Sequence, residues 1–155
     1  MKRFYLAYGS NLNLRDMSYR CRKAIPIGST VLTNYRLVYK GPADGYAYLT
    51  IEPSKDSLVP VGIFNISFFD ELRLNKYEGY PELYYKEHFP INIGNKEAKA
   101  LIYIMKDNFD YHLPNDQYID TCMMGYDYFG FDKKVLEDAF DYTKRKILTN
   151  NYPRN

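Results

Sequence analysis

The stretch that decides the fold is YLAYGSNLNLR, residues 5–15. An apolar, aromatic run stops at Gly9-Ser10-Asn11, and a helix-like pattern follows almost at once. Gly9 can turn with a positive φ and lets another group approach the backbone closely. The next amides precede a helix start, where unpaired N–H groups favour an anion. Local sequence alone favours a plain helix-capping Asx-turn over such an anion cradle, because these turns are common.

Outward from this turn, the patterning predicts short strands interleaved with a few helices. Residues 3–8 form a short, apolar run typical of a buried strand. The expected further strands are 30–39, a hairpin of 46–52 with 58–66 around PSKDS (53–57), and a second hairpin of 84–93 with 98–105 around 94–96. A turn is expected over 40–45.

Helix starts are signalled by capping residues. Asn13 can cap a helix over 14–21, and Ser67-Phe-Phe-Asp70 opens one through about Tyr77. Two more are expected over 115–128 and, capped by Asp132, over 133–148, with a frayed end after Leu148. The pattern predicts an α+β fold: a compact, mixed but mostly antiparallel β-barrel, closed or nearly closed, with surrounding helices.

Composition limits the possible functions. The 155 residues predict a single domain spanning 1–155, and 18 Tyr with 9 Phe favour a β-rich architecture. A net charge of +2 is too small for a typical nucleic-acid partner, and no run approaches the length of a membrane span. Two isolated cysteines and two histidines predict reduced thiols, a cytoplasmic location and no metal site.

The obvious nucleophiles are weak candidates. Ser10 lies in Gly-Ser-Asn rather than in a Gly-x-Ser-x-Gly elbow, and neither histidine has an evident pairing with it. Cys21 lies among basic residues that could lower its pKa, but an ordinary cysteine in a basic surface turn is the simpler interpretation. Cys122 has the pattern of a core residue on a helix face.

Glu78 is the candidate acid or base. It lies in LNKYEGYPELYYKE (74–87), at a helix end among tyrosines. A carboxylate among aromatic rings is desolvated, which raises its pKa toward the range useful for proton transfer. The negative end of the helix dipole disfavours an acid at this position, which favours a functional explanation. The alternative interpretation is an ordinary, solvated glutamate at the end of a helix.

Together these stretches resemble the γ-glutamylcyclotransferase-like family, with its avirulence-induced-gene-like and γ-glutamylamine cyclotransferase branches. The resemblance rests on YLAYGSNLN (5–13), GYAYLTIEP (45–53), VPVGIFNIS (59–67), LNKYEGYPELYYKE (74–87) and LPNDQYIDTCMMG (113–125). It implies a compact β-barrel enzyme without a cofactor that releases 5-oxoproline from a small γ-glutamyl substrate. Glu78 would be the general acid/base.

The resemblance also implies a set of substrate-binding residues. The loop would hold the α-carboxylate and amino end of the substrate through its backbone, and two tyrosines would line the pocket. These residues are Tyr5, Leu6, Ala7, Tyr8, Gly9, Ser10, Tyr85 and Tyr118. The sequence leaves open the leaving group (amino acid, amine or protected metabolite), the oligomeric state, and a non-catalytic alternative in which the same fold only binds a small ligand.

Overall fold

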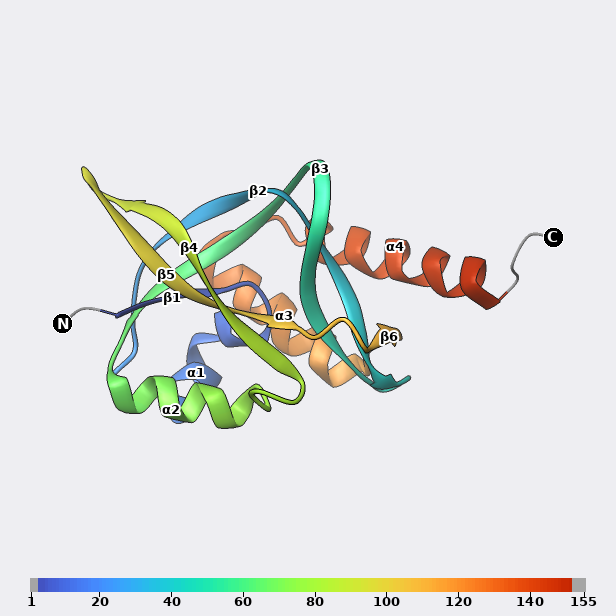
Figure 1. The fold of residues 1–155 in the computed structure, drawn as a ribbon, viewed down its shortest axis with the longest axis horizontal. Coiled ribbons are helices and arrows are strands. Elements are labelled where there is room, and N and C mark those ends of the chain that lie inside the picture. The colour runs from blue at the N-terminus through green and yellow to red at the C-terminus, as the bar shows by residue number, and fades with distance from the viewer. Residues whose placement is uncertain (1–2, 152–155) are drawn as a thin grey trace.

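The computed structural model describes residues 3–151 as a curled sheet with helices against it (Figure 1). The elements, in order, are β1 (Arg3–Ala7), the 3-10 helix η1 (Ser10–Leu12), α1 (Leu14–Arg20), β2 (Ile25–Ala43), β3 (Tyr46–Ile66), α2 (Phe68–Tyr77), β4 (Tyr84–Ile93), β5 (Lys96–Met105), β6 (Asp110–Tyr111), α3 (Asp116–Phe129) and α4 (Lys134–Asn151).

The six strands form one sheet in the order β4-β5-β1-β3-β2-β6. All neighbouring pairs are antiparallel except β1 with β5. The sheet curls into a half-barrel, so the predicted mixed α+β class is confirmed. Because β1 is a central strand, the turn that follows it starts within the middle of the sheet.

The predicted hairpin around PSKDS is wrong. β3 runs from Tyr46 to Ile66, and both of its halves pair with β2 rather than with each other. Thr33 pairs with Leu58 and Tyr35 with Pro53, so residues 54–57 bulge opposite Asn34. The Asn34 side chain accepts a hydrogen bond from the Asp56 amide at 3.0 Å, and both residues have positive φ. The real turn is at 44–45, and β2 continues through most of the turn predicted over 40–45.

The predicted helices are confirmed, and so are the caps predicted at Asn13, Ser67 and Asp132; Asn115, which was not predicted as a cap, caps α3. Asn13 accepts from the Asp16 amide, Ser67 and Asp70 form a reciprocal capping box, and Asn115 accepts from the Tyr118 amide. Asp132 accepts from the Lys134 amide at 3.0 Å. Helix α4 continues to Asn151, beyond the expected fraying at Leu148, and the end of the predicted frayed tail, 152–155, lies outside the described residues.

Both cysteines are free and buried. Cys122 lies in the core, as predicted, but the surface-turn interpretation of Cys21 is wrong because its side chain is fully buried. Burial raises the pKa of the Cys21 thiol to about 11, and that of Cys122 to about 12, against the nearby arginine charges. Neither thiol has the lowered pKa of a reactive cysteine.

Candidate active site

The turn after β1 is tighter than the sequence suggests. Gly9 has φ −128° rather than the predicted positive value, and η1 begins at once with the Leu12 amide bonded to the Gly9 carbonyl at 3.0 Å. A side chain at Gly9 would put its Cβ 3.3 Å from the Tyr118 hydroxyl and 3.4 Å from Leu49 Cβ. Glycine therefore permits a close approach here that a β-carbon would make tight.

Glu78 reaches this turn from helix α2. Its amide bonds to the Leu74 carbonyl at 2.8 Å, which makes it the C-cap residue, and Gly79 then leaves the helix with φ +63°. Glu78 and the turn line one small cavity of about 20 Å³. Its lining residues are Tyr5, Tyr8, Gly9, Ser10, Asn11, Leu49, Glu78, Tyr84, Tyr103 and Tyr118.

Asn11 connects the carboxylate to its surroundings. Its side-chain amide donates to Tyr5 Oη at 2.8 Å and to Glu78 Oε1 at 3.1 Å. Its Oδ1 accepts from Arg20 Nη1 at 2.7 Å, while the Arg20 guanidinium stacks 3.7 Å from the centre of the Tyr77 ring. Asn11 thus lies between Arg20 and Glu78, which are not joined by a direct ion pair.

The electrostatics match those of a proton-transfer group. Although Glu78 as a residue keeps some exposed surface, burial of its carboxylate raises its pKa from 4.5 to about 7. The Arg20 charge and the Asn11 hydrogen bond lower this pKa, but the desolvation is larger. A carboxyl group with a pKa near 7 can both accept and donate a proton at neutral pH.

Two tyrosines fix the far wall of the cavity to one residue of β3. The Leu49 amide donates to Tyr118 Oη at 3.0 Å, and Tyr84 Oη donates to the Leu49 carbonyl at 2.8 Å. Burial raises the pKa of both hydroxyls well above the ordinary value for tyrosine. Both rings are therefore neutral, held by the backbone, and directed at the same cavity as Glu78.

The structure brings together six of the nine predicted site residues. Leu6 and Ala7 are buried in β1, where they pair with Ile63 and Gly62 of β3 and do not line the cavity. Tyr85 also lies elsewhere: it lines a separate cavity beside Tyr35 and Phe89. Successive side chains of a strand point to opposite faces, so it is Tyr84 that faces Glu78. The six are Tyr5, Tyr8, Gly9, Ser10, Tyr118 and Glu78.

Several lining residues were not predicted. Asn11 directly follows the predicted binding turn, and its amide is a ready donor to a carboxylate, so its position alone could have indicated it. Tyr103, on β5, donates to Asn75 Oδ1 at 2.6 Å, and nothing in the sequence pattern separates it from a core tyrosine. Arg20 does not line the cavity, and its role could not be predicted from the sequence, because the packing of α1 on α2 is what brings it to Tyr77.

Classical nucleophile arrangements are not formed by the described residues. Ser10 Oγ lies 3.2 Å from Tyr77 Oη, and no histidine lines the cavity. His112 instead lies 3.1 Å from Asp44 near the surface. Within residues 3–151, no three His, Cys, Asp or Glu side chains group closely enough to hold a metal ion.

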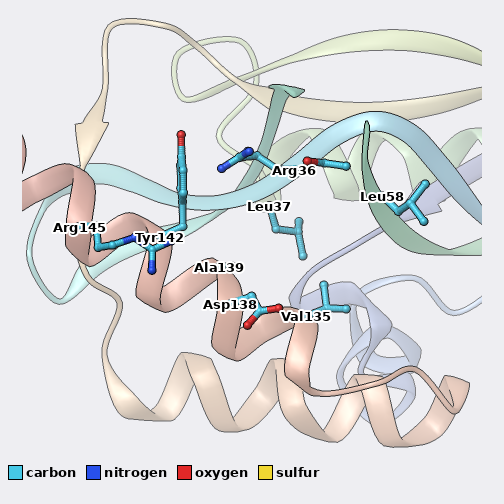
Figure 2. Close-up of a pocket in the computed structure, with 9 residues that line it drawn as sticks. Arg36, Leu37, Leu58, Val135, Asp138, Ala139, Tyr142 and Arg145 are labelled. Carbon is cyan, nitrogen blue, oxygen red and sulfur yellow. The ribbon is translucent and has the colours of Figure 1, made fainter. Parts of the chain in front are cut away.

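A larger pocket, of about 400 Å³, lies away from this site between β2, the bulge of β3 and α4 (Figure 2). Leu58 and Val135 lie at one end of it and Arg36 and Arg145 toward the other, around Tyr142 (Figure 2). None of its lining residues lines the Glu78 cavity. Size alone therefore does not identify the site, because the smaller cavity holds the perturbed carboxylate.

The fold places the desolvated carboxylate of Glu78 and the turn that follows the central strand β1 around one cavity. Residues 5–122 match the family described as gamma-glutamyl cyclotransferase, AIG2-like. The chain belongs to this family, as the sequence motifs predicted. No curated protein sequence matches the chain significantly.

Solved structures agree on the fold. A structure described as "Gamma-glutamyl cyclotransferase" is 19% identical with a TM-score of 0.75, and the match covers 90% of this chain and 86% of that one. The uncharacterized protein loc79017 from Homo sapiens is 21% identical with a TM-score of 0.76, over 89% and 86%. A glutathione-specific cyclotransferase from yeast is 9% identical with a TM-score of 0.57, over 92% and 100%.

Between Arg3 and Asn151, no helix has both the length and the apolar character that crossing a membrane requires.

Proposed function

We propose that the protein is a γ-glutamyl cyclotransferase that releases 5-oxoproline from a γ-glutamyl amino acid or amine. The observation that carries the proposal is the buried Glu78, whose pKa is raised to about 7 opposite the Gly9-Ser10 turn. Family membership supports the same class of activity. The small-molecule substrate would need no other reactive group from the protein.

In this mechanism the substrate supplies both its nucleophile and its electrophile. The γ-glutamyl α-ammonium gives a proton to the Glu78 carboxylate, and the freed amine attacks its own γ-carbonyl to close a five-membered ring. The ring nitrogen loses a second proton, and the departing nitrogen gains two. Glu78 carries these protons one at a time, and the enzyme otherwise folds the substrate into a reactive geometry.

The turn would bind the other end of the γ-glutamyl group. The amides of Ser10 and Asn11 donate to no other described residue, so both are free to hold the α-carboxylate. The cavity of about 20 Å³ holds roughly one water, so the substrate must displace part of the wall as it enters. We assign substrate contact to Tyr118 and Tyr8 in this wall, and propose no direct contact for Leu6, Ala7 or Tyr85.

The test is release of 5-oxoproline and free amine from a panel of γ-glutamyl amides. Product that depends on Glu78 supports the proposal. Tight binding of the same amides without any product would instead support a binding module, because a buried carboxylate also binds an ammonium. We place this chemistry in the cytoplasm, since the free, buried Cys21 and Cys122 suit a reducing compartment.

A further inference from the structure

A second cavity, of about 250 Å³, adjoins the Glu78 cavity. Ser10 and Tyr118 line both cavities, whereas the large cavity beside Tyr85 shares no lining residue with the Glu78 cavity. The hydroxyls of Ser10 and Tyr77 meet at 3.2 Å beside this junction. A γ-glutamyl group with its amine at Glu78 therefore has room for the amide substituent in this adjoining cavity.

The adjoining cavity is uncharged. Its lining residues are Ser10, Tyr48, Tyr77, Leu83 and Tyr118. The rings of Tyr48 and Tyr118 pack edge to face, with centroids 5.3 Å apart. The Tyr118 hydroxyl already accepts the Leu49 amide. The wall thus consists mainly of aromatic faces and one leucine, which suits apolar and aromatic groups.

The cation that stacks on the Tyr77 wall of this cavity is already engaged. Arg20 covers the Tyr77 ring at 3.7 Å and donates to Asn11 Oδ1 at 2.7 Å, and it does not line the cavity. A carboxylate or ammonium placed here would lose water without gaining an opposite charge, which is costly. An apolar substituent would instead gain from leaving water.

We propose that this adjoining cavity binds the leaving group, and that it selects amines whose remaining part is apolar or aromatic over amino acids and diamines. The inference rests on the proposed function and adds a substrate class to it. One extra or missing methylene in an apolar pocket alone changes kcat/KM by about 10- to 200-fold. We expect at least about tenfold here.

The test compares four substrates by 5-oxoproline release: the γ-glutamyl amides of benzylamine, butylamine, glycine and 1,4-diaminobutane. The first two should exceed the last two by at least about tenfold in kcat/KM. Leu83→Lys should reduce turnover of γ-glutamylbenzylamide. It should raise turnover of γ-glutamylglycine, because the introduced ammonium would pair with the glycine carboxylate. Leu83→Met, of similar size and apolar character, should keep the wild-type order.

Leu58→Lys is the matched control, because Leu58 is 61% exposed in the separate pocket of Figure 2. It should leave all four kcat/KM values unchanged, and thermal unfolding checks that each variant folds. Equal or better turnover of the charged amides, or an equal loss on all four in Leu83→Lys, overturns the inference.

Calorimetry of the four amides with Glu78→Gln separates this inference from the proposed function. An apolar preference in binding without turnover by the wild type would reject the cyclotransferase and keep the apolar subsite. Turnover without any apolar preference would keep the cyclotransferase and reject the apolar subsite.

Discussion

Replacing Glu78 with glutamine is the most direct perturbation of the site. The side-chain carbonyl of the introduced glutamine can still accept the Asn11 amide now held at 3.1 Å, so the wall of the cavity keeps its shape. What is lost is the ability to carry a proton. General acid–base groups commonly contribute about 10²- to 10⁴-fold, and Glu78 would handle every proton in the cycle. We expect a loss in kcat near the upper end, about 10⁴-fold, with a smaller change in KM.

The same variant makes a stability prediction with a definite sign. The pKa of Glu78 is about 7 in the folded protein, against 4.5 for the ordinary group. Below pH 4.5 both states hold the proton. Between pH 4.5 and pH 7 the unfolded state loses it while the buried carboxyl of the folded state keeps it, so wild-type stability falls until the folded state also ionises. Above pH 7 the loss is about 3 kcal/mol. Glutamine does not titrate. The free energy of unfolding of Glu78→Gln should therefore exceed that of the wild type by about 3 kcal/mol at pH 8, and not at pH 4.5.

Two assays check this pair of expectations. Release of 5-oxoproline at saturating substrate gives kcat, and urea unfolding at pH 4.5 and pH 8 gives the two free-energy differences. Turnover within tenfold of the wild type would refute the assignment of Glu78 as base. A stability difference that does not change between the two pH values would refute the burial argument on which the raised pKa rests.

Three further outcomes follow from particular contacts. Arg20→Gln removes a charge that lowers the pKa of Glu78, so the acid limb of the kcat/KM profile should move to higher pH; an unmoved limb would show that Arg20 does not act on Glu78. Gly9→Ala places a methyl 3.3 Å from Tyr118 Oη, and should reduce kcat/KM about tenfold in steady-state assays while leaving the fold intact by circular dichroism. Tyr118→Phe leaves the Leu49 amide without its acceptor, and should cost about 1–3 kcal/mol in urea unfolding; a neutral change would mean that water replaces the hydroxyl.

Local chemistry made the helices predictable, and long-range pairing made one hairpin unpredictable. Caps such as Ser67 act on amides three residues away, so the sequence contains the whole interaction. The PSKDS segment has turn composition, but whether it ends a strand depends on what lies opposite it. Here β2 extends far enough to pair with both halves of β3, and Asn34 satisfies the Asp56 amide in the bulge. Nothing in the segment itself encodes that partner.

The site shows the same division. Glu78 and the Gly9-Ser10 turn could be singled out because each is a local motif, and the two line one cavity. Tyr84 and Tyr85 point to opposite faces of the sheet, because a shift of one residue along a strand reverses the face. Sequence spacing alone does not fix that face when both neighbours are tyrosines. The structure fixes it through the bond from Tyr84 to the Leu49 carbonyl on β3.

The placement of Asn11 between Arg20 and Glu78 explains how the proposed base can be buried and still titrate near neutral pH. Burial alone would push the pKa of Glu78 upward and leave it protonated at neutral pH. A direct ion pair with Arg20 would do the opposite, and would also occupy the carboxylate that the substrate ammonium must reach. With Asn11 donating to Glu78 and accepting from Arg20, the positive charge acts at one remove, and the pKa settles at about 7. In the proposed reaction, the carboxylate would then stay available to the substrate ammonium, while the arginine remains stacked on Tyr77.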